Sequence, residues 1–234
     1  MLIIWPVLSF LIILALTANS FALNKNTGPK QELTDAFDSL KLHAYLNAAK
    51  AFKKSLSENY GNNHPLDLFI GLSFASAMIG DYNTAFEASI WALESEKINF
   101  EYFKADEICL FTNNYQRLIF TTPSVPELHF ALASLHMLTK NYGHAEERFK
   151  LAAAINPDCF EYQFYYAETL FIEVKYRAAA KIYEKAIAID FESFEAHDRL
   201  YKCYATLKDS QAAEAELKII EKLSGGSTIP PAQN

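Results

Sequence analysis

Small and hydrophobic residues recur along this chain at a regular interval. Ala145, Ala179 and Ala213 are equally spaced, and the interval between them is about 34 residues, which is the repeat length of several helical repeat families. The same interval relates two further sets, Phe149, Tyr183 and Leu217, and Ala152, Ala186 and Ile220. An earlier copy over 80 to 97 carries Ala85, Ser89 and Ala92 at matching offsets. Because an internal period of this length marks a repeat architecture, the sequence predicts a series of similar units.

Each unit contains two amphipathic stretches with helical spacing. The first stretches cover 66 to 79, 126 to 139, 160 to 173 and 194 to 207, and each precedes one of the aligned blocks. The pattern therefore predicts αα-hairpins, with Ala where two helices approach closely and larger residues beside it. A single hairpin cannot bury its apolar face, so the hairpins must stack into an all-α superhelix.

The turns of these hairpins resemble the tetratricopeptide repeat (TPR) family. The resemblance rests on Gly80-Asp81-Tyr82, Asn141-Tyr142 and Lys175-Tyr176, each followed by Ala at the family's spacing, and on Asn156-Pro157, which closes one copy. It implies an αα-hairpin superhelix, a TPR solenoid, over 31–223. The implied repeats are 66–99, 126–159, 160–193 and 194–227, with a degenerate copy at 29–62. The family's Trp-Leu-Gly opening is replaced, for example by Phe69, Leu72 and Ser73, so no subfamily is assigned.

The period is interrupted between residues 100 and 125. The segments 101–111 and 114–120 predict a shortened, irregular helical pair with a hinge at residues 112–114, ending at Thr121-Thr122-Pro123. We expect this insert to alter the superhelix and to separate an N-terminal block from a regular C-terminal one.

The two ends of the chain differ in character. Ile220 occupies the position that Ala holds in other repeats, so we expect no further helix to pack there and the array to stop near Leu223. The tail at 224–234 is predicted to be disordered. Residues 1–22 are apolar, with no charge before Lys25, and are followed by a linker at 23–30.

The apolar N-terminal segment has two interpretations. A signal peptide cleaved after Ala22 is favoured by the small residues there, whereas an uncleaved membrane anchor over 2–23 is favoured by its length and by the missing basic region. Both place the body of the protein outside the cytoplasm, in the bacterial periplasm or secreted, or anchored in the membrane by the N-terminal helix.

Charge and motifs exclude several function classes. The chain has 21 Lys and Arg against 28 Asp and Glu, a net charge of -7, which repels nucleic-acid phosphates. It contains no catalytic or nucleotide-binding motif, and we expect no cofactor, no metal and no enzyme activity. His129 and His136 lie on one helix face, but packing roles are favoured over a metal site.

The cysteines do not indicate a disulfide framework. Cys109, Cys159 and Cys203 are odd in number and far apart. Three unpaired, buried thiols are expected, with one disulfide as the alternative.

The concave face of such a superhelix is lined by one stripe of each first helix. Helical spacing predicts a partner-binding groove, which consists of Ile70, Phe74, Met78, Glu127, Phe130, Met137, Glu161, Phe164, Glu168, Phe171 and Lys202, with Asp67, Ser134, Glu195, Asp198 and Ala205 on the same stripes. The groove is apolar with an acidic edge and suits a peptide with large apolar anchors and some basic residues. Ordinary core packing is the alternative for each of its four Phe residues.

These features lead to the hypothesis of an exported, non-enzymatic scaffold or adaptor that binds a peptide or partner protein, in envelope assembly or secretion. The alternatives are a membrane-anchored subunit of a multiprotein complex, a homo-oligomer formed through the last helix near Ile220, and an enzyme with a cryptic site. Some TPR relatives bind chaperone carboxylates through Lys, Arg and Asn, but Lys202 is the only cation of the predicted stripe, which disfavours that activity.

Overall fold

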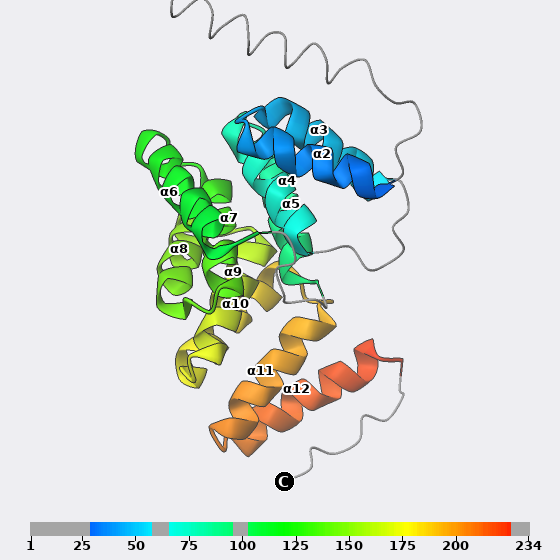
Figure 1. The fold of residues 1–234 in the computed structure, drawn as a ribbon. Coiled ribbons are helices and arrows are strands. Elements are labelled where there is room, and N and C mark those ends of the chain that lie inside the picture. The colour runs from blue at the N-terminus through cyan, green and yellow to red at the C-terminus, as the bar shows by residue number, and fades with distance from the viewer. Residues whose placement is uncertain (1–28, 58–65, 96–102, 226–234) are drawn as a thin grey trace, which may run out of the picture.

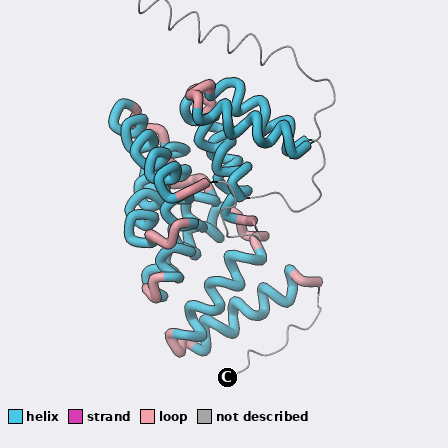
Figure 2. Tube along the Cα trace, in the orientation of Figure 1, coloured by secondary structure: helices cyan, strands magenta, loops and turns pink. Residues whose placement is uncertain are grey.

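The computed structural model describes residues 29–57, 66–95 and 103–225, and these ranges contain eleven helices and no strand. The all-α prediction is therefore confirmed for the described part of the chain (Figures 1 and 2). The helices are α2 (Pro29–Lys41), α3 (Tyr45–Ser57), α4 (Leu66–Met78), α5 (Tyr82–Leu93), α6 (Ala105–Thr121), α7 (Pro126–Leu138), α8 (Tyr142–Ile155), α9 (Phe160–Ile172), α10 (Tyr176–Ile189), α11 (Phe194–Thr206) and α12 (Ser210–Leu223).

Most of the predicted terminal segments lie outside the described residues. This holds for the apolar segment at 1–22, for the linker up to residue 28 and for the tail beyond residue 225. Helix α2 begins at Pro29, so residues 29 and 30 belong to a helix and not to the linker.

Ten of the helices form five hairpins that stack in sequence. The pairs are α2–α3, α4–α5, α7–α8, α9–α10 and α11–α12, and each second helix also packs on the next first helix of the array (Figure 1). Helix α5 packs directly on α7, although the 17-residue helix α6 lies between them in the sequence. The stack therefore continues across the insert.

The small residues of the repeat period lie in the interior, as predicted. Ala85, Ala145 and Ala179 are fully buried and Ala213 is 7% exposed, while Phe149 and Tyr183 are also fully buried beside them. Ile220 is only 1% exposed, so it does not mark an open face of the last helix. Ile220 itself is therefore not available for an oligomer contact, while the expected contact through the exposed face of the last helix near Ile220 stays a prediction.

Residues at one position of the first helices fix the loops between repeats. His129, Gln163 and His197 occupy equivalent positions in three successive repeats, and a side-chain nitrogen of each lies 3.0 to 3.1 Å from a carbonyl oxygen six residues earlier. The acceptors are Pro123, Pro157 and Phe191. His129 and His197 therefore do take part in packing, as expected, but they do so through hydrogen bonds to loop carbonyl groups beside the core.

The hairpin turns share one backbone device. In each, a single residue has a left-handed φ, and two backbone N–H groups bond back to the helix as in a Schellman motif, for example from Val174 to Phe171 and from Lys175 to Leu170. The left-handed residues are His43 (φ 58), Gly80 (φ 81), Lys140 (φ 61), Val174 (φ 64) and Lys208 (φ 61). Only one of these five positions is occupied by Gly, the residue that adopts this conformation without strain.

Val174 is the most strained residue of this set, because its β-branched side chain opposes a left-handed backbone. We expect Val174→Gly to increase the free energy of unfolding by about 1 kcal/mol, since strain of that size is removed and the side chain is already 66% exposed. Urea unfolding followed by circular dichroism measures the change. Val174→Ala, which keeps Cβ, is the control and should gain less; an unchanged or lowered stability of the Gly variant would contradict the strain.

Gly71 and Gly143 form a matched pair for testing the close contact of α3 with α4. A Cβ on Gly71 would lie 2.5 Å from a ring carbon of Phe52, whereas a Cβ on Gly143 meets no atom within 4 Å. We expect Gly71→Ala to lower the free energy of unfolding by about 1 to 3 kcal/mol through overpacking, and Gly143→Ala to raise it by about 0.5 kcal/mol through helix propensity. Equal effects of the two substitutions in chemical denaturation would be inconsistent with this packing.

Candidate functional site

The insert forms one continuous helix, α6, so the predicted hinge at residues 112–114 is wrong. The polar residues there do not break the helix because their side chains bond to its own carbonyl groups. Thr112 Oγ1 donates to the Ile108 carbonyl at 3.0 Å, and Asn114 Nδ2 donates to the Leu110 carbonyl at 2.9 Å.

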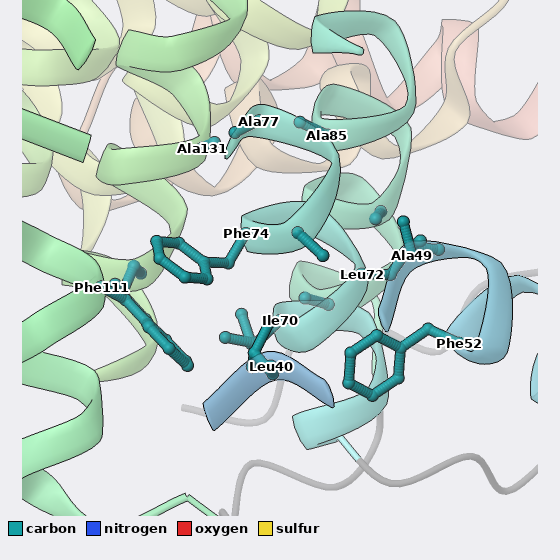
Figure 3. Close-up of a cluster of buried hydrophobic side chains, with 14 of the residues drawn as sticks. Leu40, Ala49, Phe52, Ile70, Leu72, Phe74, Ala77, Ala85, Phe111 and Ala131 are labelled. Atoms are coloured by element: carbon teal, nitrogen blue, oxygen red, sulfur yellow. The ribbon is translucent and has the colours of Figure 1, made fainter. Parts of the chain in front are cut away.

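Helix α6 lies against the first helices α4 and α7 and covers the predicted groove stripe of α4. The ring of Phe111 stacks on Phe74 with centroids 4.2 Å apart (Figure 3). Ahead of the helix, the Phe103 N–H donates to Asp67 Oδ1 at 2.7 Å. Phe74 is buried under the Phe111 ring; Ile70 on the same stripe is buried too, and Met78 is half-buried. The chain itself therefore occupies the inner face of the N-terminal half.

A buried hydroxyl network fixes α6 in this position. Ser73 Oγ lies 2.8 Å from both Tyr115 Oη and Ser89 Oγ, and Ser89 Oγ donates to the Ala85 carbonyl at 2.8 Å. Burial raises the pKa of Tyr115 above its ordinary range, so its hydroxyl stays protonated. These contacts join α4, α5 and α6 through groups whose separation would leave buried hydroxyls unpaired.

Three of the four predicted groove phenylalanines are core residues. Phe74 is described above, and Phe130 is fully buried with its ring 4.8 Å from Phe86 and 5.1 Å from Phe149. Phe164 is 8% exposed and stacks on Phe160 at 5.4 Å. Core packing, the alternative left open for these side chains, is what the structure shows. Only Phe171 remains half-buried.

Several polar side chains of the predicted stripes form hydrogen bonds or ion pairs with other residues of the chain. Glu168 accepts from the Tyr183 hydroxyl at 2.5 Å and pairs with Arg199 at 2.7 Å, and the Arg199 guanidinium carbon lies 5.8 Å from the centre of the Phe171 ring. Lys202 is exposed and pairs with Asp198 at 2.6 Å. Arg199 is thus a second cation on this face, which helical spacing did not assign to it.

Met137 takes part in packing between neighbouring repeats. It is half-buried against the core of α7, α8 and α9, and its sulfur lies 4.0 Å from Thr169 Oγ1.

Acidic side chains from distant parts of the sequence converge around Tyr162 and Tyr165. Glu94 closes α5, while Glu127, Glu161 and Glu195 follow the first residues of α7, α9 and α11. We call these four residues the acidic cluster. Burial and then the charge of Glu127 raise the pKa of Tyr162, and Glu161 accepts from the Cys159 thiol at 3.1 Å.

Electrostatic effects connect three members of the acidic cluster, Glu94, Glu161 and Glu195. Burial, followed by the charges of Glu195 and Glu161, raises the pKa of Glu94 above its ordinary value. Burial and then the charges of Glu94 and Glu195 raise the pKa of Tyr165. The arrangement favours a positively charged group, since each added cation relieves repulsion between the carboxylates.

Spacing identified only part of this cluster. Glu127, Glu161 and Glu195 occupy equivalent positions in three repeats, whereas Glu94 belongs to the end of a second helix and has no local signal that places it beside them. Glu195 lies on a predicted stripe but is not among the predicted binding residues.

The three cysteines are free thiols. The expectation of burial is wrong for Cys109, which is exposed; Cys159 is half-buried and Cys203 is buried. Burial is the main cause that raises the pKa of Cys159 to about 11 and of Cys203 to about 12. Both thiols therefore stay protonated near neutral pH and are poor nucleophiles.

The described residues contain no group of three or more His, Cys, Asp or Glu side chains placed to hold a metal ion. His136 faces His144 with ring centroids 5.3 Å apart, and His129 bonds to its loop carbonyl, so the two helix histidines do not act together. In the same described ranges, none of the helices combines the length and the apolar character that a membrane span requires.

Comparison with known proteins supports the fold. Solved structures of MamA, a TPR-like helical repeat protein, match most of the chain. A mutant form aligns with a TM-score of 0.51 at 14% identity, over 86% of this chain and 94% of that chain. A crystal structure of the MamA protein aligns with a TM-score of 0.49 at 14% identity, over 86% and 98%. Because only 14% of the aligned residues are identical, this similarity shows a shared fold and nothing more specific. No family model and no curated protein sequence matches the chain.

His136 makes the stability of the α7–α8 hairpin sensitive to acid. Burial, and then the neighbouring His144 and Arg148, lowers the pKa of His136 to about 4. The folded state favours the neutral ring. The contribution of His136 to the free energy of unfolding is therefore complete at pH values above the unfolded pKa near 6.5, and it is lost as the pH falls towards 4. We expect this single group to remove up to about 1.4 kcal/mol of stability per pH unit across that window.

The test compares wild type with His136→Leu in urea unfolding at pH 7 and pH 5. The two proteins should differ little at pH 7, whereas the Leu variant should be the more stable by about 1 to 2 kcal/mol at pH 5. A constant difference between them at both pH values would show that His136 does not titrate in this way.

Proposed function

We propose that this protein is a non-enzymatic scaffold that binds a segment of a partner protein on the inner face of its C-terminal half, at α9 and α11. The helical-repeat fold supports an interaction role, since stacked hairpins offer an extended concave surface. The observation that carries the proposal is that Glu94, Glu161 and Glu195, which belong to three separate helices, all act electrostatically on Tyr165 of α9.

The location in the C-terminal half follows from the position of α6. The inner residues of α4 contact the chain's own segment 103–121, so a partner has no access to Phe74 or Asp67 while α6 is in place. Along α9 and α11, by contrast, Glu161, Phe171 and Lys202 keep part of their side chains accessible.

The chemistry of this surface defines the partner segment. The carboxylates whose charges raise the pKa of Glu94 favour Lys or Arg, and the aromatic faces beside them favour the same cations as well as apolar side chains. We therefore expect an extended or helical segment with basic residues next to apolar ones. The acidic cluster supplies attraction that is weakened by salt.

The test uses Glu161→Lys combined with Glu195→Lys. The amount of partner recovered with this double variant, by crosslinking and pulldown from native envelope fractions, should fall by at least about tenfold. The reason is that the new lysines place like charges opposite the basic segment. The matched control is Glu87→Lys combined with Glu147→Lys, which changes the net charge equally at two exposed positions on second helices. Recovery of identical partners by both variants would refute the proposed surface.

We further propose that the protein is exported and acts in envelope assembly or secretion. The support is the uncharged apolar stretch before Lys25, with small residues at Ser20 and Ala22. N-terminal sequencing of the purified protein is expected to begin at Leu23. A mature protein that still begins at residue 1 would favour the membrane-anchored alternative.

A further inference from the structure

A small apolar cavity lies at the other end of the molecule, where the N-terminal hairpin meets α4 and α6. It has a volume of about 50 Å³ and is partly open to solvent. Its walls are almost entirely aromatic and aliphatic, and they are formed by Phe37, Leu40, Tyr45, Phe74, Phe103 and Phe111. Some of these residues are labelled in Figure 3, where Phe111 lies beside Phe74 and Leu40 lies beside Ile70.

The aromatic walls support one another and hold the cavity open. Phe103 lies edge-on to Phe37 at 5.1 Å and to Phe111 at 4.9 Å, Phe111 stacks on Phe74 at 4.2 Å, and Phe74 meets Tyr45 at 5.8 Å. Because each ring is held by the next, no wall can move inward without losing a ring contact elsewhere. Atoms that line an unfilled space lack contacts on one side, which favours an apolar occupant over water.

The mouth of the cavity combines opposite charges with an exposed apolar side chain. Lys41 Nζ of α2 lies 3.7 Å from Glu107 Oε1 of α6, and both residues line the cavity. Leu110 lines it as well and is 48% exposed. A donor and an acceptor side by side suit a peptide backbone, which offers both a carbonyl oxygen and an N–H group. A fatty-acid carboxylate would instead meet the negative charge of Glu107.

We propose that this cavity is a binding socket for one leucine-type side chain of a partner polypeptide. A dry cavity of about 150 Å³ accommodates the six carbons of benzene, or about 25 Å³ per carbon. By that ratio 50 Å³ accommodates two carbons, which are the two methyl groups of a leucine, while the rest of the side chain occupies the mouth. Alanine is too short to reach the walls, and a phenyl ring is too large.

This socket is independent of the acidic inner face proposed above. It is built from α2, α3, α4 and α6, whereas the acidic cluster comes from the end of α5 and the starts of α7, α9 and α11. A negative binding test at one site therefore says nothing about binding at the other.

The test is a titration of the full chain with N-acetyl-leucine N-methylamide, followed by the ¹³C-methyl NMR signals of Leu40. We expect saturable shifts, with the alanine analogue more than tenfold weaker, because each buried carbon contributes about fourfold in affinity. Shifts that do not saturate, or equal binding of the two analogues, would overturn the proposal. The acid 4-methylpentanoate, with a similar aliphatic tail, should bind more weakly; tighter binding would show that the occupant is a free acid and not a polypeptide.

Two matched variants locate the binding. Leu110→Trp places an indole over the mouth and should abolish the Leu40 shifts, whereas Leu46→Trp adds the same group at an exposed position that does not line the cavity and should leave them unchanged. Unaltered binding by the Leu110 variant, with its circular dichroism spectrum and melting temperature as in wild type, would show that the probe binds elsewhere.

Discussion

The packing of each second helix against the next first helix is the constraint on which the whole structure depends. An isolated hairpin would leave its apolar side in water, so every repeat needs its neighbour. The fully buried Ala145 and Ala179 allow the helices to come close, and the large rings of Phe149 and Tyr183 fill the space beside them. The polar bonds from His129 and His197 to loop carbonyls then fix how one repeat follows the next.

The sequence was sufficient to predict this repeated part, because its signals are local or recur at a constant distance. Ala179 and Tyr183, for example, are one helical turn apart, and each has an equivalent in the preceding repeat. The path of α6 was not predictable in the same way. Its position depends on contacts such as that between Ser73 and Tyr115, which are 42 residues apart and occur once. The polar Thr112 and Asn114 suggested a hinge, but their side chains bond within the helix.

The candidate site was predictable to a similar extent. Helical spacing predicted a stripe on each first helix that includes Glu127 and Glu161 of the acidic cluster. The same stripes also include Phe74 and Phe130, which other parts of the chain cover. Helical spacing shows which way a side chain points but not what lies opposite. Glu94 illustrates the converse case, since its electrostatic interactions with Glu161 and Glu195 connect the end of α5 to helices that are far away in the sequence.

The direct contact of α5 with α7 has a consequence for how such a protein can change over evolutionary time. The chain leaves the array after α5, forms α6, and returns to the place that the next repeat would take without any insert. An extra segment added at such a junction leaves the contact between the flanking repeats in place, even where its own side chains, here Phe111 and Tyr115, become part of the interior. A repeat protein can in this way acquire a new surface feature at one joint while its neighbours keep their original register.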